Sequence, residues 1–249
     1  MTQPHPAAVR ILSVRLDAVT LGEAVTMVDG YIAARTPHQI VTVNPEFVVQ
    51  ARGDAAFRTA LEQADLALPD GVGLVWAARV LGTPLRGRVT GVDLVDALAA
   101  RAVERGHRLF LLGGAGGVAE AAAAVLQSRY PAVRVAGCYA GSPRPDEEAD
   151  IVERVQSVRP DVLLVAYGAP AQDVWGHRNL AALGVPVVIG VGGTFDYLSG
   201  RVARAPGWVR RAGFEWLYRL VRQPWRWRRQ LRLPVFVALV LRQRLTRRA

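Results

Sequence analysis

A single carboxylate separates two apolar stretches in residues 66–75, LALPDGVGLV. Pro69 ends the first stretch, Asp70 follows it, and Gly71 precedes an apolar segment with helical spacing. An aspartate directly before a helix can accept hydrogen bonds from the free N–H groups of the first turn, so one interpretation of Asp70 is a helix cap. The other is a reactive carboxylate, because this residue follows an apolar run at the position where open parallel sheets place their ligands. The local sequence alone leaves both roles open.

Other polar or glycine-rich residues also follow apolar runs. Thr42 and Asn44 come at the end of HQIVTVN, and a spacing of two places both side chains on one face of a strand. Further runs lead into GGAGG at 113–117, YGAPAQD at 167–173 and GGTFD at 192–196. Because ligands bind outside the carboxyl ends of strands in open parallel sheets, these positions are candidates for a binding site.

The segment GGAGGVA fits the dinucleotide-binding pattern G-x-G-x-x-[GA] through Gly114, Gly116 and Ala119. The acidic residue that an NAD site needs about 20 positions later is missing, since RVAGCYAG occupies that region. One interpretation is an NAD-dependent oxidoreductase, which the missing acid disfavours. The others are a loop whose backbone N–H groups approach a nucleotide diphosphate and a plain tight turn.

The remaining acids are interpreted as structural. Thr90 and Asp93 in TGVD are typical of a capping box, and Asp146 with Glu147 is typical of the first turn of a helix. Gln172, at the start of a predicted helix, is interpreted as a cap or as a solvated side chain, and its position at the edge of the sheet also makes it a candidate for the site. The chain has no D-x-D pair with which to hold a divalent cation, so arginines would have to neutralise the phosphates of a nucleotide-sugar substrate.

Apolar runs alternate with helical patterns over most of the chain. The runs are ILSVRLDAVT, HQIVTVN, DLALPD, RLFLLGG, VRVAGCYAG, DVLLVAYG and VPVVIGVGG, and the helical patterns include VDLVDALAARAVERG and VAEAAAAVLQSRY. This alternation predicts an α/β fold with a parallel sheet covered by helices on both faces. A chain of 249 residues that is 51% hydrophobic can bury such a core in one domain.

Cysteine, histidine and hydropathy patterns exclude several classes of protein. The lone Cys138 cannot form an internal disulfide framework, and the four histidines are too scattered for a zinc site. The N-terminus MTQPHPAAVRILSVRLDAVT lacks the basic flank and long apolar core of a signal peptide, and no run approaches about 18 uncharged apolar residues. We therefore expect a cytoplasmic protein without a metal site or a membrane span.

Positive charge is concentrated at the C-terminus. Residues 201–249 contain fourteen arginines and one acid, Glu215, so this segment carries +13 while the rest of the chain carries −3. Four tryptophans interleave with the arginines, and Pro224 and Pro234 are expected to divide the segment into short helices. We therefore divide the chain into a core, residues 1–203, and a basic helical appendage, residues 204–249.

The appendage has three interpretations. An arginine-rich amphipathic segment with tryptophans suits an anionic membrane surface. Basic residues with interleaved aromatic side chains also suit single-stranded nucleic acid. The third interpretation is a terminal helix that packs on the domain. The uninterrupted apolar run LPVFVALVL favours the membrane, because a nucleic-acid-binding face has little use for such a run.

Seven motifs, in one order along the chain, resemble the WecG/TagA/CpsF family of glycosyltransferases. They are TVNPEFVVQA (42–51), ADLALPDGVGLVWAARVLG (64–82), RVTGVDL (88–94), FLLGG (110–114), YGAPAQD (167–173), GVGGTFDYLSG (190–200) and RAPGWVRRAGFEWLYRLVRQPWRWRR (204–229). The family often has PKQE where this chain has PAQD, and the last twenty residues have no role that the resemblance transfers.

The resemblance implies a Rossmann-like core and an inverting, metal-independent transfer of a sugar from a UDP donor, without a cofactor. The expected sugar is N-acetylmannosamine, with its uronic acid or glucose as alternatives, and the expected acceptor is a GlcNAc-type saccharide on a polyprenyl diphosphate. The product would enter a cell-surface polysaccharide or a teichoic acid. The expected location is the inner face of the cell membrane, bound peripherally, with no nucleic-acid partner and with the oligomeric state left open.

The resemblance also implies roles for particular residues. Asp70 is the candidate general base, with Thr42 beside it as a second catalytic residue. The expected substrate contacts are Asn44, Arg88 and Gln172, together with the strand-end residues Gly113, Gly114, Gly193, Thr194 and Asp196, the last of which would hold the nucleotide. Three arginines of the appendage would close over the site and meet the diphosphate: Arg219, Arg226 and Arg229.

Overall fold

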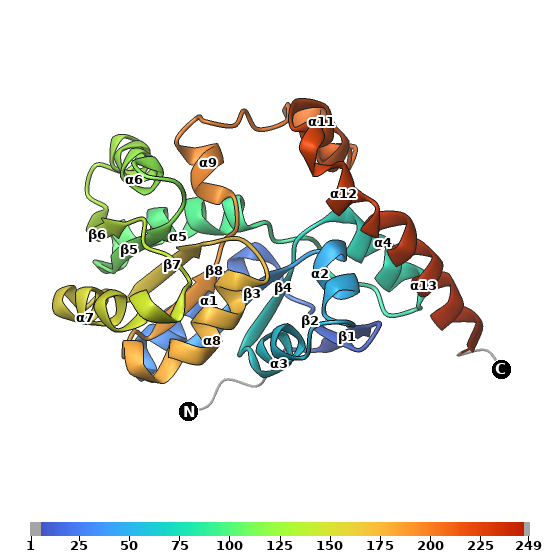
Figure 1. Cartoon of the computed structure of the whole chain (residues 1–249), viewed down its shortest axis with the longest axis horizontal. Coiled ribbons are helices and arrows are strands. Elements are labelled where there is room, and N and C mark those ends of the chain that lie inside the picture. The colour runs from blue at the N-terminus through green and yellow to red at the C-terminus, as the bar shows by residue number, and fades with distance from the viewer. Residues whose placement is uncertain (1–5, 247–249) are drawn as a thin grey trace.

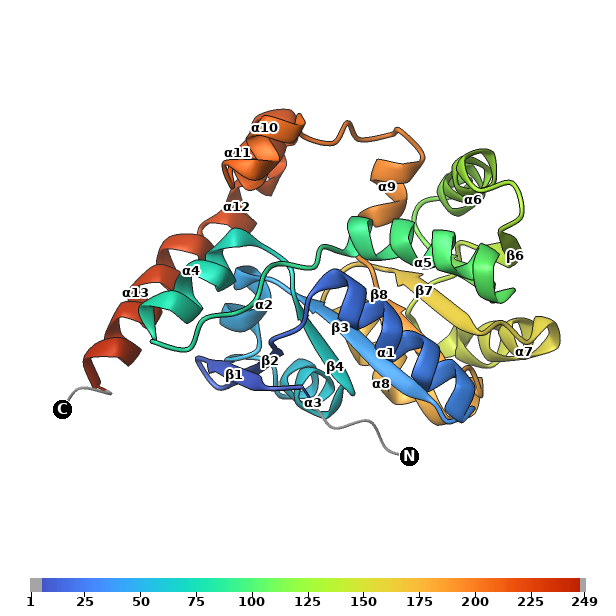
Figure 2. The ribbon, with the colours of Figure 1, turned by 180° about the vertical axis from the view of Figure 1, so that it is seen from behind.

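A computed structural model of the protein describes residues 6–246 and contains a six-stranded sheet with the strand order β4-β3-β8-β7-β5-β6. Every neighbouring pair in this sheet is parallel. Figures 1 and 2 show helices on both faces. The strands are β3 (His38–Val43), β4 (Leu66–Pro69), β5 (Arg108–Gly113), β6 (Arg134–Tyr139), β7 (Val162–Ala166) and β8 (Val187–Gly190). The predicted α/β fold with a parallel sheet is confirmed.

Alternate residues of the strands pack into two layers of core, which explains why these strands read as nearly continuous apolar runs. On one face lie α1 (Leu21–Ala34), α5 (Gly91–Arg105), α6 (Val118–Arg129) and α9 (Thr194–Leu198). On the other face lie α2 (Pro45–Gln50), α3 (Ala55–Gln63), α4 (Val72–Val80), α7 (Glu148–Val158) and α8 (Ala171–Leu183), with a short 3-10 turn, η1 (Pro145–Glu147), before α7.

The sequence pattern predicts that the first apolar run belongs to the main sheet. The structure places this run outside that sheet. ILSVRLDAVT contributes to an antiparallel hairpin of β1 (Ala8–Ile11) and β2 (Val14–Asp17). Leu12 and Ser13 both have positive φ, 48° and 73°, which is the backbone of a two-residue hairpin turn but lacks the usual asparagine or glycine. The buried Asp17 carboxylate accepts a hydrogen bond from the Ala67 N–H at 2.7 Å and so joins the hairpin to β4.

The appendage consists of short helices followed by one longer helix. These are α10 (Gly207–Arg211), α11 (Glu215–Arg222), the 3-10 turn η2 (Pro224–Arg226), α12 (Trp227–Gln230) and α13 (Arg232–Thr246). Pro224 opens η2, but Pro234 lies in the first turn of α13 and does not divide helices as expected, because a first-turn proline lacks only an N–H that has no helical partner.

Helix α13 packs against α2 and α4, as Figure 1 shows (red helix). Its residues Phe236 and Val240 are buried in the core cluster that α2 and α4 share. The packed terminal helix is therefore present, although other apolar side chains of the same helix face outward. None of the helices among residues 6–246 has the length and apolarity needed to cross a membrane. The division of the chain at residues 203 and 204 stays a prediction.

Candidate active site

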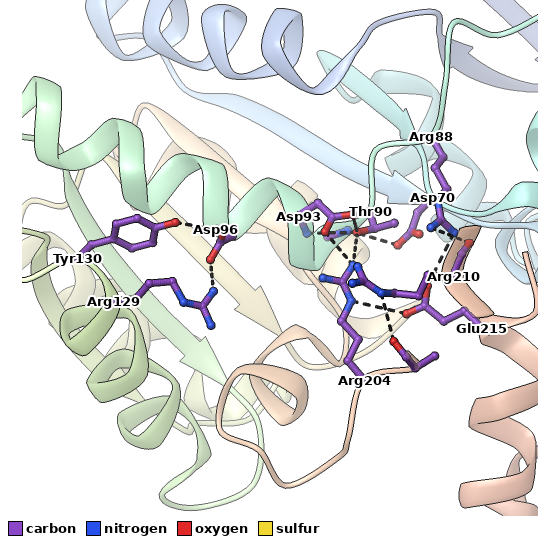
Figure 3. Close-up of polar contacts among 12 residues, drawn as sticks. Asp70, Arg88, Thr90, Asp93, Asp96, Arg129, Tyr130, Arg204, Arg210 and Glu215 are labelled. Carbon is purple, nitrogen blue, oxygen red and sulfur yellow. Dashed lines mark hydrogen bonds and ion pairs between the residues drawn. The ribbon is translucent and has the colours of Figure 1, made fainter. Parts of the chain in front are cut away.

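The parallel strands bring the candidate residues to one edge of the sheet. The segments that follow β3, β4, β5, β7 and β8 all leave at the carboxyl ends of their strands, where ligands bind in folds of this kind. Within these segments lie all the strand-end candidates that the sequence indicated. Figure 3 shows the part of this edge around Asp70.

Asp70 does not cap the helix that follows it. The N-cap residue of α4 is Gly71, at φ 130°, and no side chain caps that helix. The Asp70 backbone N–H instead donates to the Val43 carbonyl at 2.6 Å, and its carboxylate accepts a long hydrogen bond of 3.4 Å from the N–H of Gly91, the first residue of α5. The carboxylate therefore faces the N-terminus of a neighbouring helix, which attracts negative charge.

Burial raises the pKa of the Asp70 carboxyl group to about 7, although the residue as a whole is only half-buried. The hydrogen bond from Gly91 lowers this pKa, the negative charge of Glu215 raises it, Arg88 lowers it and Asp93 raises it. A carboxyl group with a pKa near neutrality is half in its basic form at pH 7. A general base needs such a proton affinity and a position that the substrate can reach, and Asp70 lies at the edge of the sheet where ligands bind.

Three of the predicted site residues hold the strand ends together. The Thr42 hydroxyl donates to the Gly190 carbonyl on β8 at 2.8 Å, and the Thr194 hydroxyl donates to the Val191 carbonyl at 2.6 Å. Gln172 Oε1 accepts hydrogen bonds from Gly168 at 3.1 Å and Gly192 at 2.9 Å, linking the loops after β7 and β8. All three side chains are buried, so they shape the floor of the site.

Asn44 lies directly after β3 and is the N-cap of α2, where its side chain accepts a hydrogen bond from Phe47 at 3.1 Å. Thr90 and Asp93 form the predicted cap of α5: the Thr90 hydroxyl accepts from the Asp93 N–H and donates to the Asp93 carboxylate. Asp93 also pairs with Arg204 at 2.8 Å. The structural interpretation of Asp93 is thus confirmed, and its position adds charge beside Asp70.

The glycine-rich loops bring backbone close together. Gly113 has φ 102°, and a Cβ there would lie 2.8 Å from the Ala166 carbonyl carbon, so only glycine fits between β5 and β7. Gly114, at φ 81°, continues the turn, and α6 begins at Val118 without a side-chain cap. The predicted strand, glycine turn and helix are confirmed, and the first N–H groups of α6 have no side-chain partner.

The appendage arginines occupy different places. The Arg219 guanidinium lies over the Tyr197 ring, 4.9 Å from its centroid, and a Cβ at Gly193 would lie 2.7 Å from Arg219 Nη2. Arg219 therefore rests on the start of α9, the short helix that also carries the half-buried Asp196. Arg229 instead pairs with Glu46 of α2 at 2.7 Å. The side chain of Arg226 is outside the part of the chain that the structure describes.

Several residues near the site were not selected from the sequence. Glu215, Arg204 and Arg210 form a network with Arg88 beside Asp70, and Asp173 is fully buried next to Gln172. In the sequence, Glu215 stands out only as the one acid among the many arginines of residues 201–249. Across residues 6–246, no group of acidic, histidine and cysteine side chains is placed to hold a metal ion.

A parallel α/β core that gathers glycine-rich loops and a carboxyl group of raised pKa at the carboxyl edge of its sheet is an arrangement typical of enzymes. A sequence model described as "Glycosyl transferase WecG/TagA/CpsF family" matches residues 9–249. The chain belongs to this family and is a glycosyltransferase. The predicted family is confirmed, and the oxidoreductase and nucleic-acid-binding alternatives are not favoured.

Curated relatives support the same assignment. Three proteins named N-acetylglucosaminyldiphosphoundecaprenol N-acetyl-beta-D-mannosaminyltransferase are similar to this chain. The Bacillus spizizenii protein is 34% identical over 82% of this chain and 78% of its own length. The Bacillus subtilis protein is 34% identical over 86% and 82%, and the Staphylococcus aureus protein is 32% identical over 94% and 92%.

Proposed function

We propose that this glycosyltransferase moves N-acetylmannosamine from UDP to a GlcNAc-type saccharide on a polyprenyl diphosphate, with inversion at the anomeric carbon. The observation that carries the proposal is Asp70, a half-buried residue at the ligand edge of the sheet, whose carboxyl group faces the N-terminus of α5 and has its pKa raised by burial to about 7. The names of the curated relatives support this choice of sugar and acceptor. N-acetylmannosaminuronic acid and glucose are the alternative sugars.

The chemistry is a single displacement. The acceptor hydroxyl oxygen forms a bond to the anomeric carbon while the bond from that carbon to the UDP oxygen breaks. Asp70 takes the hydroxyl proton, for which its raised proton affinity suits it. A base placed in this way contributes about 10²- to 10⁴-fold to the rate. Attack from the face opposite the leaving group gives inversion.

The donor is proposed to lie across the glycine-rich loops. Gly113 and Gly114 allow the backbone N–H groups at the start of α6 to approach the diphosphate, as happens at other helix N-termini. Gly193 is the N-cap of α9 and Asp196 lies in its first turn, where Asp196 would accept hydrogen bonds from the ribose hydroxyls. Arg219, which rests on the start of this helix, can stabilise the negative charge that develops on the departing β-phosphate.

We propose that arginines, rather than a metal ion, neutralise the leaving diphosphate. Arg88 and Arg219 are both half-buried beside the strand ends, where desolvation strengthens their attraction for phosphate. The expected consequence is that EDTA leaves the transfer rate unchanged and added Mg²⁺ raises it by less than about twofold. Loss of transfer in EDTA with recovery on Mg²⁺ would contradict this part of the proposal.

The appendage is proposed to bind an anionic membrane on the cytoplasmic side. Its exposed apolar side chains are interspersed with arginines and include Trp208, Trp216, Val221, Trp225, Trp227, Leu231, Val235, Leu241 and Leu245. Tryptophan at headgroup depth and arginine at lipid phosphate are the contacts expected of an interfacial helix. This surface would keep the enzyme where a polyprenyl-linked acceptor is embedded.

Membrane binding can be tested by charge removal. Replacing Arg222 and Arg228 with glutamine should weaken the affinity for vesicles containing phosphatidylglycerol, measured by cosedimentation, by about thirtyfold, because each basic residue near such a surface contributes about 1 kcal/mol. The matched control replaces Arg129 and Arg144, which lie on the core and are similarly exposed. Equal weakening by both pairs would show that overall charge, and not the appendage, sets the affinity.

The substrate assignment is tested with a panel of radiolabelled UDP-sugars and a short-chain lipid-diphosphate GlcNAc acceptor. We expect UDP-N-acetylmannosamine to give the highest kcat/KM. Preference for the uronic acid or for glucose would select the alternative donor. If no UDP-sugar is turned over, while NAD but not UDP raises the melting temperature of the protein, the proposed function is wrong.

A further inference from the structure

Glu215 is the only acid among residues 201–249, and its side chain points back to the core (Figure 3). It begins α11 and is about three-quarters buried, with a side-chain exposure of 23%. One carboxylate oxygen lies 3.7 Å from Arg88 Nη1, and the other lies 3.8 Å from Arg204 Nε. One appendage carboxylate therefore bridges two guanidinium groups.

Arg88 has a second contact with the appendage. Its Nη2 donates to the Arg210 carbonyl of α10 at 3.1 Å, while Glu215 attracts its other terminal nitrogen. Both contacts hold Arg88 toward the appendage. Asp70 also feels the charges of Arg88 and Glu215, so the three groups share one pocket. The structure contains no hydrogen bond or ion pair between Arg88 and Asp70 among its described residues.

We propose that Glu215 is a positioning residue: it holds the Arg88 guanidinium away from Asp70, and so leaves the base free to accept the proton of the acceptor. This inference rests on the proposed function, in which Asp70 is the base. The physical reason is competition between carboxylates for one guanidinium. Without Glu215, the Arg88 guanidinium is left to interact with Asp70, whose pKa its charge already lowers, and a paired carboxylate is a weaker base.

The rest of the pocket does not supply a substitute for Glu215. Asp93 is already held by Arg204 and by the Thr90 hydroxyl. Arg210 contributes its backbone carbonyl, which is a neutral acceptor. Residues 201–249 contain no other acid, and docking of α10 and α11 places several arginines near one another. Glu215 is thus the one carboxylate that residues 201–249 themselves bring to the contact between the appendage and the core.

The experiment compares Glu215→Gln with Glu215→Asp in the full chain, using the preferred UDP-sugar and the lipid-diphosphate acceptor. Glu215→Gln keeps the size of the side chain and removes its charge, so kcat should fall about tenfold. The acidic limb of the pH profile should also move to lower pH, because Arg88 and the loss of a negative charge both favour ionised Asp70. The position of this limb follows the pKa of Asp70, which burial raises most and which the Gly91 N–H, Glu215, Arg88 and Asp93 also shift. Glu215→Asp, which keeps the charge, should retain the limb.

A double-variant cycle tests whether Glu215 acts through Arg88. The Arg88→Gln enzyme is expected to have lost some donor binding already. Adding Glu215→Gln to it should lower kcat by less than twofold, since no Arg88 guanidinium remains to be held. The control is Glu104→Gln, which removes an exposed acid paired with Arg101 at the far end of α5 and should change neither kcat nor the limb.

Three results would overturn the inference: an unchanged Glu215→Gln enzyme, a lower kcat with an unmoved acidic limb, or the same tenfold loss in the Arg88→Gln background. Failure of the proposed function has a different signature, because an Asp70→Asn enzyme would then retain full transfer. If Asp70→Asn is inactive while Glu215→Gln behaves like Glu104→Gln, only the inference about Glu215 is wrong.

Discussion

Two aspartates at the same edge of the sheet have the same raised pKa but different surroundings. Asp70 follows β4, and Asp173 lies in the first turn of α8, after β7. Burial raises the pKa of each to about 7. Asp70 is a half-buried residue that feels the charge of Arg88, whereas Asp173 is 0% exposed.

A raised pKa in these two aspartates reports burial, and it does not by itself identify a general base. Asp173 is enclosed beneath β8, next to Gly190 and Gln172, where no substrate hydroxyl can reach it. Its backbone carbonyl accepts a hydrogen bond from the Gln39 side chain at 2.8 Å, which fixes the start of α8. Access from solvent, together with adjustable neighbouring charges, separates the candidate base from the structural acid.

The largest expected effect is on catalysis. Asp70→Asn should lower kcat by about 10²- to 10⁴-fold, because the amide cannot accept the proton, while UDP binding measured by calorimetry stays within about threefold. Asp173→Asn should lower kcat by less than about tenfold. If the two variants lose activity equally, access does not distinguish these carboxylates and the comparison fails.

The pH dependence of transfer should follow Asp70. The base must be ionised, so kcat/KM should rise with pH and level off above about pH 7, the value to which burial raises the pKa of Asp70. Asp173→Asn should keep this acidic limb. A limb that disappears in Asp173→Asn would instead assign the titration to the enclosed carboxyl group.

Stability should respond to both aspartates in the same direction. Each folded-state pKa lies above the ordinary value of 3.8, so between about pH 4 and 7 the folded protein retains a proton that the unfolded chain releases. The free energy of unfolding therefore falls as pH rises through this window. At pH 8, Asp173→Asn should raise the melting temperature by roughly 2–6 °C and Asp70→Asn by less, with smaller gains at pH 4.

Calorimetry at the two pH values provides the measurement. If Asp70→Asn raised the melting temperature more than Asp173→Asn, the half-buried residue would carry the greater desolvation cost. This result would contradict the expectation that Asp173 is the more strongly desolvated of the two.

The smallest expected effect concerns the neighbouring charges. Asp93 raises the pKa of Asp70, but Arg204 lies 2.8 Å from Asp93 and offsets much of its charge. Asp93→Asn should therefore move the acidic limb by less than about half a pH unit, toward lower pH. The matched control is Asp96→Asn, one turn along α5, whose partners are Arg129 and Tyr130 (Figure 3). Equal shifts in both variants would contradict a local effect on Asp70.

Much of the fold was predictable because its determinants are local. Buried parallel strands read as short apolar runs, and the runs of β3, β4, β5, β7 and β8 were recognised with the polar or glycine residues that end them. The spacing of Thr90 and Asp93 predicts the start of α5, because their side chains contact each other within one turn. The hairpin was missed because its turn, Leu12 and Ser13, adopts positive φ without the residues that usually signal it.

The order of the amino acids is enough to place Asp70 after an apolar strand and to show that arginines crowd the C-terminal segment, with Glu215 as their single acid. It left undecided whether Asp70 caps its own helix. Only the tertiary structure showed that this carboxylate faces Gly91, 21 residues later, and shares its pocket with Arg88 and Glu215. The reason is physical: capping and strand patterns depend on neighbours along the chain, whereas desolvation and charge pairing depend on groups that only folding brings together.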